Sequence, residues 1–284
     1  MKKIAVISFL SLAAFLMAGQ VRAEDSNSPA EKKADDVADL AKAAQNPIAN
    51  MISLPFQSNV FFGGGQKHAP IYNMNISPVI PIKLNEDWNL ITRTVIPFMS
   101  QPSQFDGMDS STGFGDINPT FFFSPAKPGE WIWGIGPTLQ LPTHTDDELG
   151  SDKWCVGPAG VFLKIQGPWV YGMLLNNLWS VGGSGQTVNK FLLQPFVNYN
   201  LPKGWYLTAS PVITADWEAK GGQQWTVPLG GGIGRLFKMG KMPVNAQVQV
   251  FSNVISPDYG PDWSLRFQIQ FLFPKWESIK LIKY

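Results

Sequence analysis

The stretch that decides the fold is LRFQIQFLF, from Leu265 to Phe273, near the end of the chain. Its odd positions are all apolar, whereas Arg266, Gln268 and Gln270 hold three of the four even positions. A period of two residues is that of a β-strand with one apolar and one polar face. The apolar face contacts either the core of a soluble sandwich or lipid, and the rest of the sequence decides between the two.

The composition favours lipid. Charged residues make up 15% of the 284 residues and aromatic residues 13%, whereas soluble domains carry about 25% charged residues. The chain has 22 Lys+Arg against 21 Asp+Glu, so it lacks the basic surplus that nucleic-acid binding usually needs. We therefore expect no nucleic-acid partner.

The N-terminus predicts secretion. Lys2 and Lys3 precede a mostly apolar stretch over residues 4–19, and Ala23 closes a typical cleavage site. Residues 1–23 thus read as a cleaved signal peptide. An uncleaved anchor is the alternative, but the apolar stretch is shorter than the ~20 residues that a membrane span needs.

Residues 24–51 form a distinct N-terminal segment that the sequence predicts to be partly helical. Apolar residues in it recur at i, i+3, i+4 and i+7, at Val37, Leu40, Ala41 and Ala44. Asn46-Pro47 ends the pattern. The helix lies either in the periplasm or inside a pore as a plug, and both alternatives stay open.

From residue 52 onward the two-residue alternation recurs in twelve candidate strands. Most have the length of about 10 residues that a tilted strand needs to cross a bilayer, against ~5–6 for soluble strands. The predicted fold is all-β: a transmembrane antiparallel β-barrel of about twelve strands over residues 52–273, followed by a periplasmic tail over 274–284. The expected strands are 52–62, 72–82, 88–98, 113–123, 131–141, 153–164, 169–179, 190–199, 205–216, 224–237, 244–250 and 265–273.

The connections support the barrel, because short and mostly longer ones take turns along the chain. The short ones are residues 83–87, 124–130, 165–168, 200–204 and 238–242. Alternation of tight periplasmic turns with longer outer loops is typical of outer-membrane barrels. An even number of strands also places both ends of the barrel on the periplasmic side.

Tryptophans and prolines give two further signals. Trp residues gather at opposite strand ends, as bilayer interfaces favour. They are Trp88, Trp131, Trp169 and Trp205 at one end, and Trp154, Trp179, Trp217, Trp225 and Trp263 at the other. Prolines fall within seven strands and predict bulges or shifted strand ends, because proline removes a ladder hydrogen bond. They are Pro78, Pro119, Pro137, Pro158, Pro195, Pro211 and Pro228.

Lipid offers no partner to an unpaired backbone N–H or C=O group, so the sheet must close on itself. Twelve strands enclose more space than the eight whose side chains just fill a barrel. We therefore expect a small solvated or partly plugged lumen that is polar and mostly neutral. The candidate lumen-lining residues are Asn73, Asn75, Arg93, Asp116, Asn118, Gln140, Gln194, Asn198, Asp216, Gln247, Gln249, Arg266 and Gln268.

Five long stretches bring a known family to mind: NPIANMISLPFQSN (46–59), LNEDWNLITRTVIPFMSQP (84–102), GFGDINPTFFFSPAKPG (113–129), GPTLQLPT (136–143) and LLQPFVNYNLPKGWYLTASPVITADWEA (192–219). In these stretches the chain resembles proteobacterial outer-membrane barrels that often carry the misleading label "neuromedin U" or simply "transporter". That group in turn resembles the barrels placed beside meta-pathway phenol-degradation operons. The resemblance implies an outer-membrane barrel with a transport role, and it implies no catalytic residues and no defined substrate.

Enzymatic chemistry has little support. A barrel-borne Ser-His hydrolase is the alternative, and it needs a histidine beside a serine nucleophile. His68 and His144 both fall in expected outer loops, and His144 lies among Thr143, Thr145 and Asp146 rather than beside a serine. We therefore expect solvated loop histidines and no catalytic residue.

The sequence signals for ligand sites are equally weak. The acidic stretch at residues 143–152 could offer oxygen ligands to calcium, but its spacing is not that of an EF-hand loop. GGGIG at 230–234 lacks the Lys-Ser/Thr ending of a phosphate loop. We expect no metal and no cofactor. Arg93 and Asp116 fall on adjacent expected strands, where they either pair with each other or contact a solute.

These observations predict a channel in the outer membrane of a Gram-negative bacterium that passes small, aromatic or amphipathic solutes by passive diffusion. Its expected partners are outer-membrane lipid, the barrel-insertion machinery through the C-terminal strand, and a small solute that the sequence does not name. The rivals are a non-conducting structural or adhesin-like barrel and, third, an outer-membrane hydrolase.

Overall fold

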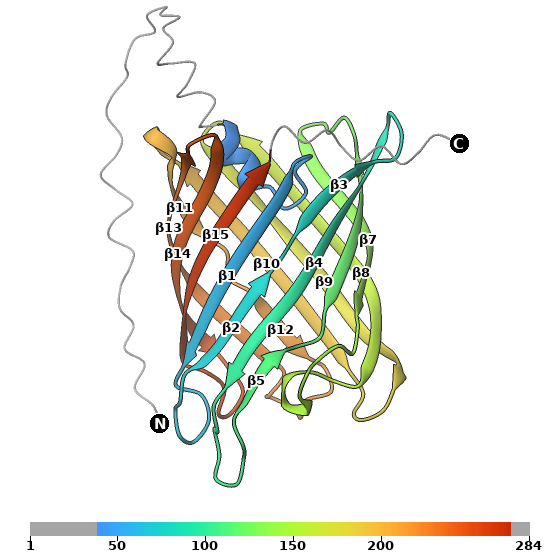
Figure 1. Cartoon of the computed structure of the whole chain (residues 1–284), viewed down its shortest axis with the longest axis vertical. Helices are drawn as coiled ribbons and strands as arrows, with labels where there is room; N and C mark the ends of the chain where they lie inside the picture. Colours follow the sequence, from blue (N-terminus) through green and yellow to red (C-terminus); the bar gives the residue numbers. More distant parts are fainter. Residues whose placement is uncertain (1–38, 274–284) are drawn as a thin grey trace, which may run out of the picture.

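The computed structural model describes residues 39–273. The predicted signal peptide, the first part of the N-terminal segment and the tail at 274–284 lie outside these residues. The described chain is one closed antiparallel β-barrel (Figure 1). Fifteen strand segments make twelve passes, because three passes are each split in two.

The strands follow the expected order along the chain. They are β1 (Ile52–Phe62), β2 (Ile71–Ile76), β3 (Val79–Lys83), β4 (Trp88–Gln101), β5 (Ser111–Phe114), β6 (Asn118–Pro125), β7 (Trp131–Gln140), β8 (Lys153–Gln166), β9 (Trp169–Gly183), β10 (Asn189–Asn200), β11 (Trp205–Ala209), β12 (Ile213–Asp216), β13 (Trp225–Met239), β14 (Met242–Ile255) and β15 (Trp263–Phe273). Two 3-10 turns, η1 (Asp147–Leu149) and η2 (Pro202–Gly204), lie in connections.

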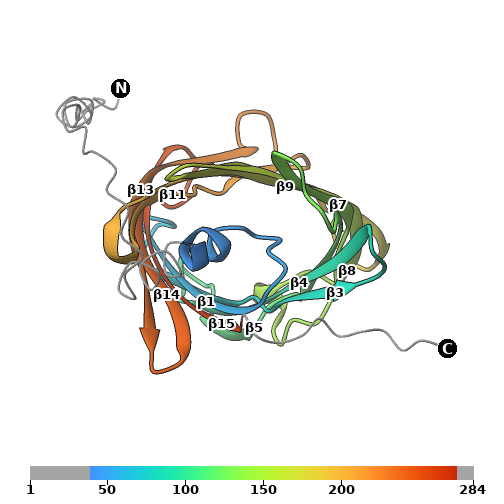
Figure 2. The same cartoon turned by 90° about the horizontal axis from the view of Figure 1, so that it is seen from above.

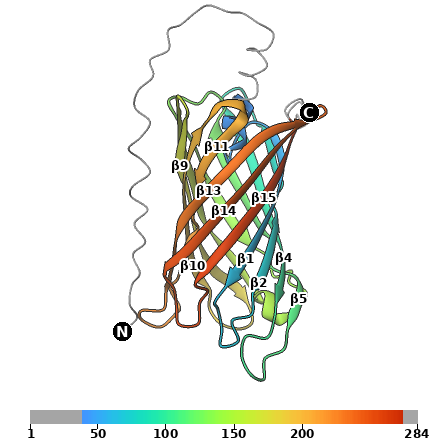
Figure 3. The same ribbon diagram turned by 90° about the vertical axis from the view of Figure 1, so that its left-hand side faces the viewer.

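The barrel closes between its last and first strands. β15 pairs with β1 in an unbroken register from Ile52 opposite Phe273 to Phe62 opposite Trp263. The strands run obliquely across the wall (Figure 3). Every backbone ladder thus finds a partner without an exposed edge, which is what a hydrocarbon solvent requires.

The apolar face of β15 points out of the barrel and its polar face points inward. Phe267 and Ile269 are 48% and 49% exposed on the outside of the barrel, whereas Arg266 and Gln270 are each 7% exposed and point inward. All nine tryptophans of the two predicted rings are exposed as well. No helix within residues 39–273 is long and apolar enough to cross a membrane. The apolar face of the sheet is therefore its outer, lipid-facing surface.

Three of the seven strand prolines lie at strand breaks or register shifts, and four lie inside continuous strands. Pro78 lies between β2 and β3, Pro211 lies between β11 and β12, and a register shift falls between Val227 and Pro228. These three meet the expectation of irregularities. The other four lie inside continuous strands, where Pro137 of β7 and Pro158 of β8 stand directly opposite each other. A residue in a non-bonded antiparallel pair directs its N–H position toward the strand on its other side. On those sides the pairing is interrupted: β7 pairs with β6 only at Thr138 and Ile135, and the β8–β9 ladder skips Pro158.

The described part of the N-terminal segment, residues 39–51, lies inside the barrel. A short helix at residues 39–44 lies inside the ring of strands (Figure 2), at the end of the barrel where the short turns lie. Ala41 and Met51 pack against the inward-facing Leu236 and Leu272. These apolar contacts therefore hold this segment inside the ring of strands, against the inner face of the wall.

Ile48 anchors the rest of that segment on the opposite wall. It is 3% exposed and packs in a cluster of apolar side chains that includes Ile91, Phe122 and Leu163. Gln45 and Asn200 exchange two amide hydrogen bonds of 2.9 and 3.1 Å at the same end. Residues 39–51 thus span part of the lumen from one wall to the other.

Candidate functional site: the lumen and its outer mouth

The barrel encloses an internal cavity of about 140 Å³. Ala44, Gln45, Asn46 and Pro47 of the N-terminal segment line one side of it. The other lining residues come from strands around the barrel and from the breaks after β2 and β11: Ser53, Pro55, Gln57, Ser77, Val79, Arg93, Leu174, Gln194, Phe196, Asn198, Tyr206, Thr208, Ser210, Asn245, Gln247, Gln268 and Gln270. Most polar groups among them are neutral amides and hydroxyls, which can donate or accept hydrogen bonds.

Five of the candidate lumen residues meet at this cavity: Arg93, Gln194, Asn198, Gln247 and Gln268. They come from β4, β10, β14 and β15, so strands from distant parts of the sequence contribute to one space. The remaining eight candidates are not among its lining residues.

Arg266 and Gln249 are two of those eight. Their side chains hydrogen-bond backbone groups in the break between β11 and β12. The guanidinium of Arg266 donates to the Ser210 carbonyl at 2.7 Å and to Asn59 Oδ1 at 2.9 Å. Gln249 Oε1 accepts from the Ser210 N–H at 3.0 Å. The Arg266 guanidinium also lies 4.8 Å from the ring of Phe251. Backbone groups freed by the break are therefore satisfied by side chains across the lumen.

Four further candidates lie away from the cavity. Asn118 donates to Thr138 Oγ1 at 3.2 Å, and Asp216 accepts from the Glu218 N–H at 3.1 Å at the outer end of β12. Asn73 and Asn75 stand opposite Asn59 and Gln57 of β1, respectively. These side chains belong to the inner face, but they lie along the wall beyond the cavity.

Tyr206 is a cavity residue that our sequence analysis left out. Its hydroxyl donates to Asn245 Oδ1 at 2.7 Å, and Asn245 donates to Gln270 Oε1 at 3.2 Å. Gly234 makes room for the ring, because a Cβ at this position would lie 2.1 Å from Tyr206 Cζ. The signal was available: Tyr206 shares the period of the polar face, and a glycine stands near it on the next pass.

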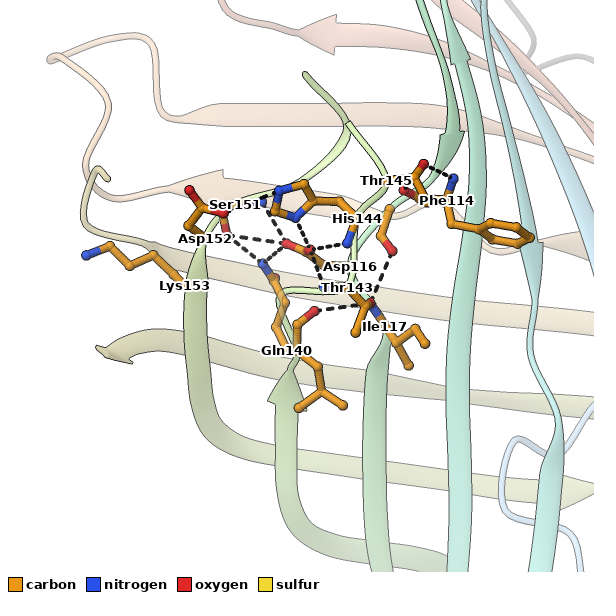
Figure 4. Close-up of polar contacts among 12 residues, drawn as sticks. Phe114, Asp116, Ile117, Gln140, Thr143, His144, Thr145, Ser151, Asp152 and Lys153 are labelled. Atoms are coloured by element: carbon orange, nitrogen blue, oxygen red, sulfur yellow. Dashed lines mark hydrogen bonds and ion pairs between the residues drawn. The ribbon is translucent and has the colours of Figure 1, made fainter. Parts of the chain in front are cut away.

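Of the two alternatives for Arg93 and Asp116, pairing with each other is wrong. Asp116 lies in the break between β5 and β6, where its carboxylate accepts from Gln140 Nε2 at 2.9 Å and from the Ser151 N–H at 2.8 Å (Figure 4). His144 Nδ1 lies 2.8 Å from Asp116 Oδ1. Asp116 and Gln140, the last two of the thirteen candidates, thus join the outer loop instead of the cavity.

The expectation of a solvated His144 is also wrong. Its side chain is 9% exposed, and its Nε2 lies 3.5 Å from Asp152 Oδ1. A Cβ on Gly150 would lie 2.5 Å from the imidazole, so glycine permits this approach. The sequence did not reveal the burial because the loop folds back onto a strand break 28 residues away.

The outer loop over residues 141–152 turns into the barrel mouth. Leu149 of η1 is 3% exposed, and it lies where side chains on Gly113 and Gly115 would otherwise project. Gly115 also faces Pro97 and Met99, which are on the same face of β4 as the cavity residue Arg93. The loop therefore narrows the outer end of the lumen.

The arrangement around His144 differs from a Ser-His-acid chain. In that chain the histidine lies between the serine and the acid, whereas here the Ser151 hydroxyl donates to Asp116 at 3.3 Å. No serine of residues 39–273 hydrogen-bonds the imidazole of His144. The same residues contain no group of three or more His, Cys, Asp or Glu side chains placed to hold a metal ion. His68, the other histidine, has its Nδ1 3.0 Å from the Gly63 carbonyl oxygen in an exposed loop.

Comparison with known proteins gives a fold likeness. No family model matches the chain, and no curated protein sequence matches it, so the sequence resemblance stays a prediction. The COG4313 outer membrane channel from Pseudomonas putida F1 superposes with a TM-score of 0.59 at 15% identity, over 78% of this chain and 94% of that chain.

Two other solved structures superpose less well. The CymD monoaromatic hydrocarbon channel gives a TM-score of 0.45 at 8% identity, over 86% of this chain and 92% of that one. Outer membrane phospholipase A from Escherichia coli gives a TM-score of 0.43 at 14% identity, over 84% of this chain and 96% of that chain. Neither likeness bears on function at these scores. The chain has the fold of bacterial outer-membrane β-barrels, a fold that channels share.

Proposed function

We propose that this protein is a channel of the Gram-negative outer membrane that passes small amphipathic or aromatic solutes by passive diffusion. Residues 1–23 are the cleaved signal peptide, and lipid surrounds the exposed apolar belt. The C-terminal strand directs insertion by the barrel-assembly machinery. Residues 24–51 form a plug that restricts the lumen.

The observation that carries this proposal is the internal cavity and its lining. A barrel filled by its own side chains needs no internal space, whereas this one keeps about 140 Å³ lined mainly by neutral polar groups. Apolar side chains of Leu174, Phe196 and Val79 line the same space. A lumen with both kinds of surface suits a solute that has a polar and an apolar part.

The N-terminal segment determines how open the path is. Ala44 to Pro47 border the cavity, and Ile48 anchors them on the barrel wall. Three small side chains of the helix, Ala41, Ala43 and Ala44, belong to or pack against the cluster with Leu236 and Leu272, together with Leu40. Small contacts of this kind stabilise a position weakly, which suits a plug that moves.

Single-channel recording in planar bilayers tests the function. We expect current steps from the mature full-length protein and larger steps after deletion of residues 24–50. Larger steps after deletion identify the segment as a plug. Silence of both proteins, with barrel folding verified by heat-modifiable gel migration, would refute the channel.

One observation favours the rival of a non-conducting structural barrel. The N-terminal segment and the loop at 141–152 narrow opposite ends of the same lumen. That rival expects no current from either protein in the recording described above, so the same measurement separates the two functions.

A further inference from the structure

The charge of the cavity is unbalanced. Arg93 is the only Arg, Lys, Asp or Glu among the residues that line it. No hydrogen bond or ion pair joins the Arg93 guanidinium to any part of the chain that the structure describes. A guanidinium carries five N–H donors and stays protonated in proteins, so Arg93 offers this cavity a cation that no partner among residues 39–273 engages.

A second guanidinium reinforces the first. Arg266 donates to Asn59 and to Ser210, and Ser210 itself lines the cavity. Its acceptors are neutral, so its positive charge is not cancelled within residues 39–273. Two uncancelled cations inside a narrow barrel create a positive potential that low-dielectric walls focus.

Asp116 and Asp216, the two acidic residues among the lumen candidates, are not among the residues that line this cavity. Asp116 lies at the outer mouth, where Gln140, Ser151 and His144 engage its two oxygens. An enclosed charge without a counter-charge costs free energy, and an anion that enters would recover part of it. The site is therefore suited to an anionic ligand and unsuited to a cation.

The rest of the lining defines the body of that ligand. Val79, Leu174 and Phe196 form an apolar side, while Gln57, Gln194 and Gln268 supply amide groups. The cavity of about 140 Å³ is close to the roughly 150 Å³ that an engineered cavity in another protein offers to benzene. One ring-sized apolar group therefore fits beside the guanidinium.

We propose that the cavity is a binding site for small monocarboxylates with a ring-sized apolar body, in which Arg93 pairs with the carboxylate. This inference rests on the proposed channel function and assigns its solute class. Planar guanidinium and carboxylate groups match in a two-point hydrogen-bonded pair, which lysine does not reproduce. Neutral and cationic analogues of the same shape lack this pair.

Equilibrium binding to the purified mature protein in detergent tests the site without requiring conductance. Isothermal titration with benzoate, benzamide and benzylamine compares an anion, a neutral analogue and a cation of similar size. We expect saturable benzoate binding that is at least about tenfold tighter than that of either analogue, as loss of one charge-assisted hydrogen-bonded contact implies.

Two variants make the test specific. Arg93→Gln should weaken benzoate binding about tenfold or more and leave benzamide unchanged. Arg235→Gln is the matched control, because Arg235 lies on the outside of β13, over the ring of Trp205 at 5.0 Å. Heat-modifiable migration of each variant verifies that the barrel is folded. Arg93→Lys should recover only part of the benzoate affinity.

The inference fails if benzoate does not bind, if benzamide binds as well as benzoate, or if Arg93→Gln keeps wild-type benzoate affinity. Its failure is distinct from that of the channel. A protein that conducts but shows no preference for benzoate refutes only the anion site, and one that binds benzoate selectively but never conducts refutes only the channel.

Discussion

His144 Nδ1 and Asp116 Oδ1 lie 2.8 Å apart, although the two residues are separated by 28 positions in the sequence. Asp116 lies in a strand break and His144 lies in an outer loop, so one short polar contact fastens that loop to the wall. The carboxylate also accepts from the Ser151 N–H at 2.8 Å, which fixes the far end of the same loop. Asp116 thus joins both ends of the loop to the wall, beside Thr143 and Thr145, whose hydroxyls accept from the N–H groups of Ile117 and Phe114.

Removing His144 should release the loop. His144→Ala deletes a contact to a buried carboxylate, and hydrogen bonds to charged groups contribute about 1.5–3 kcal/mol. We expect faster amide hydrogen exchange over residues 141–152 and unchanged exchange in the β13–β14 ladder. His68→Ala is the control, because that histidine lies in an exposed loop. Unaltered exchange at 141–152 would show that other contacts hold the loop.

Replacing Asp116 should have a wider effect than replacing His144. Asp116→Ala leaves Gln140, His144 and Ser151 without a common acceptor. We expect exchange to increase over residues 141–152 and also at Gln140, at the end of β7. Asp106→Ala is the control, because the Asp106 side chain is 96% exposed. The prediction is wrong if the Asp116 and His144 variants give the same exchange map.

The plug should loosen when its anchor is shortened. Ile48 is 3% exposed, and truncation of a buried isoleucine to alanine costs about 2–5 kcal/mol. We expect Ile48→Ala to raise single-channel conductance toward that of the protein without residues 24–50. Ile269→Ala removes the same atoms from the outer surface, where the side chain is 49% exposed, and should leave conductance unchanged. Equal conductance of the Ile48 variant and the wild type would argue against a mobile plug.

Gly234 should not tolerate a side chain. A Cβ there would lie 2.1 Å from Tyr206 Cζ and would push the ring away from Asn245. Overpacking of this kind costs about 1–3 kcal/mol. We expect Gly234→Ala to lower the temperature at which the barrel unfolds. Heat-modifiable gel migration after incubation at increasing temperatures measures this change. Gly182→Ala is matched to it, since nothing lies within 4 Å of a Cβ at that position, and it should behave as wild type.

The outer face should reject charge. Phe267 is 48% exposed on the lipid-facing side of β15, and arginine near the bilayer midplane costs about 2–4 kcal/mol. We expect Phe267→Arg to reduce the yield of folded barrel in reconstituted lipid vesicles. Tyr259→Arg is the control in an outer loop, where Tyr259 is 62% exposed. Normal folding of the Phe267 variant would contradict a hydrocarbon environment for this face.

The sequence by itself determined the barrel and the direction of its faces. In β15 the alternation of Phe267 and Ile269 with Arg266 and Gln268 is local, and any antiparallel partner gives the same inner and outer sides. The number of passes followed from the same signal, because each one needs about ten residues. The sequence did not predict that three passes are each divided into two strands, although Pro78 and Pro211 lie at two of these breaks.

Only the tertiary structure decided which inner groups meet. Arg266 reaches the Ser210 carbonyl across 56 positions, and Asp116 engages His144 instead of Arg93. These contacts depend on register, on strand breaks and on the inward fold of an outer loop, none of which a two-residue period encodes. Within residues 39–273 the charge of Arg93 is left without a counter-charge, since Asp116, one of the partners considered for it, is held at the outer mouth.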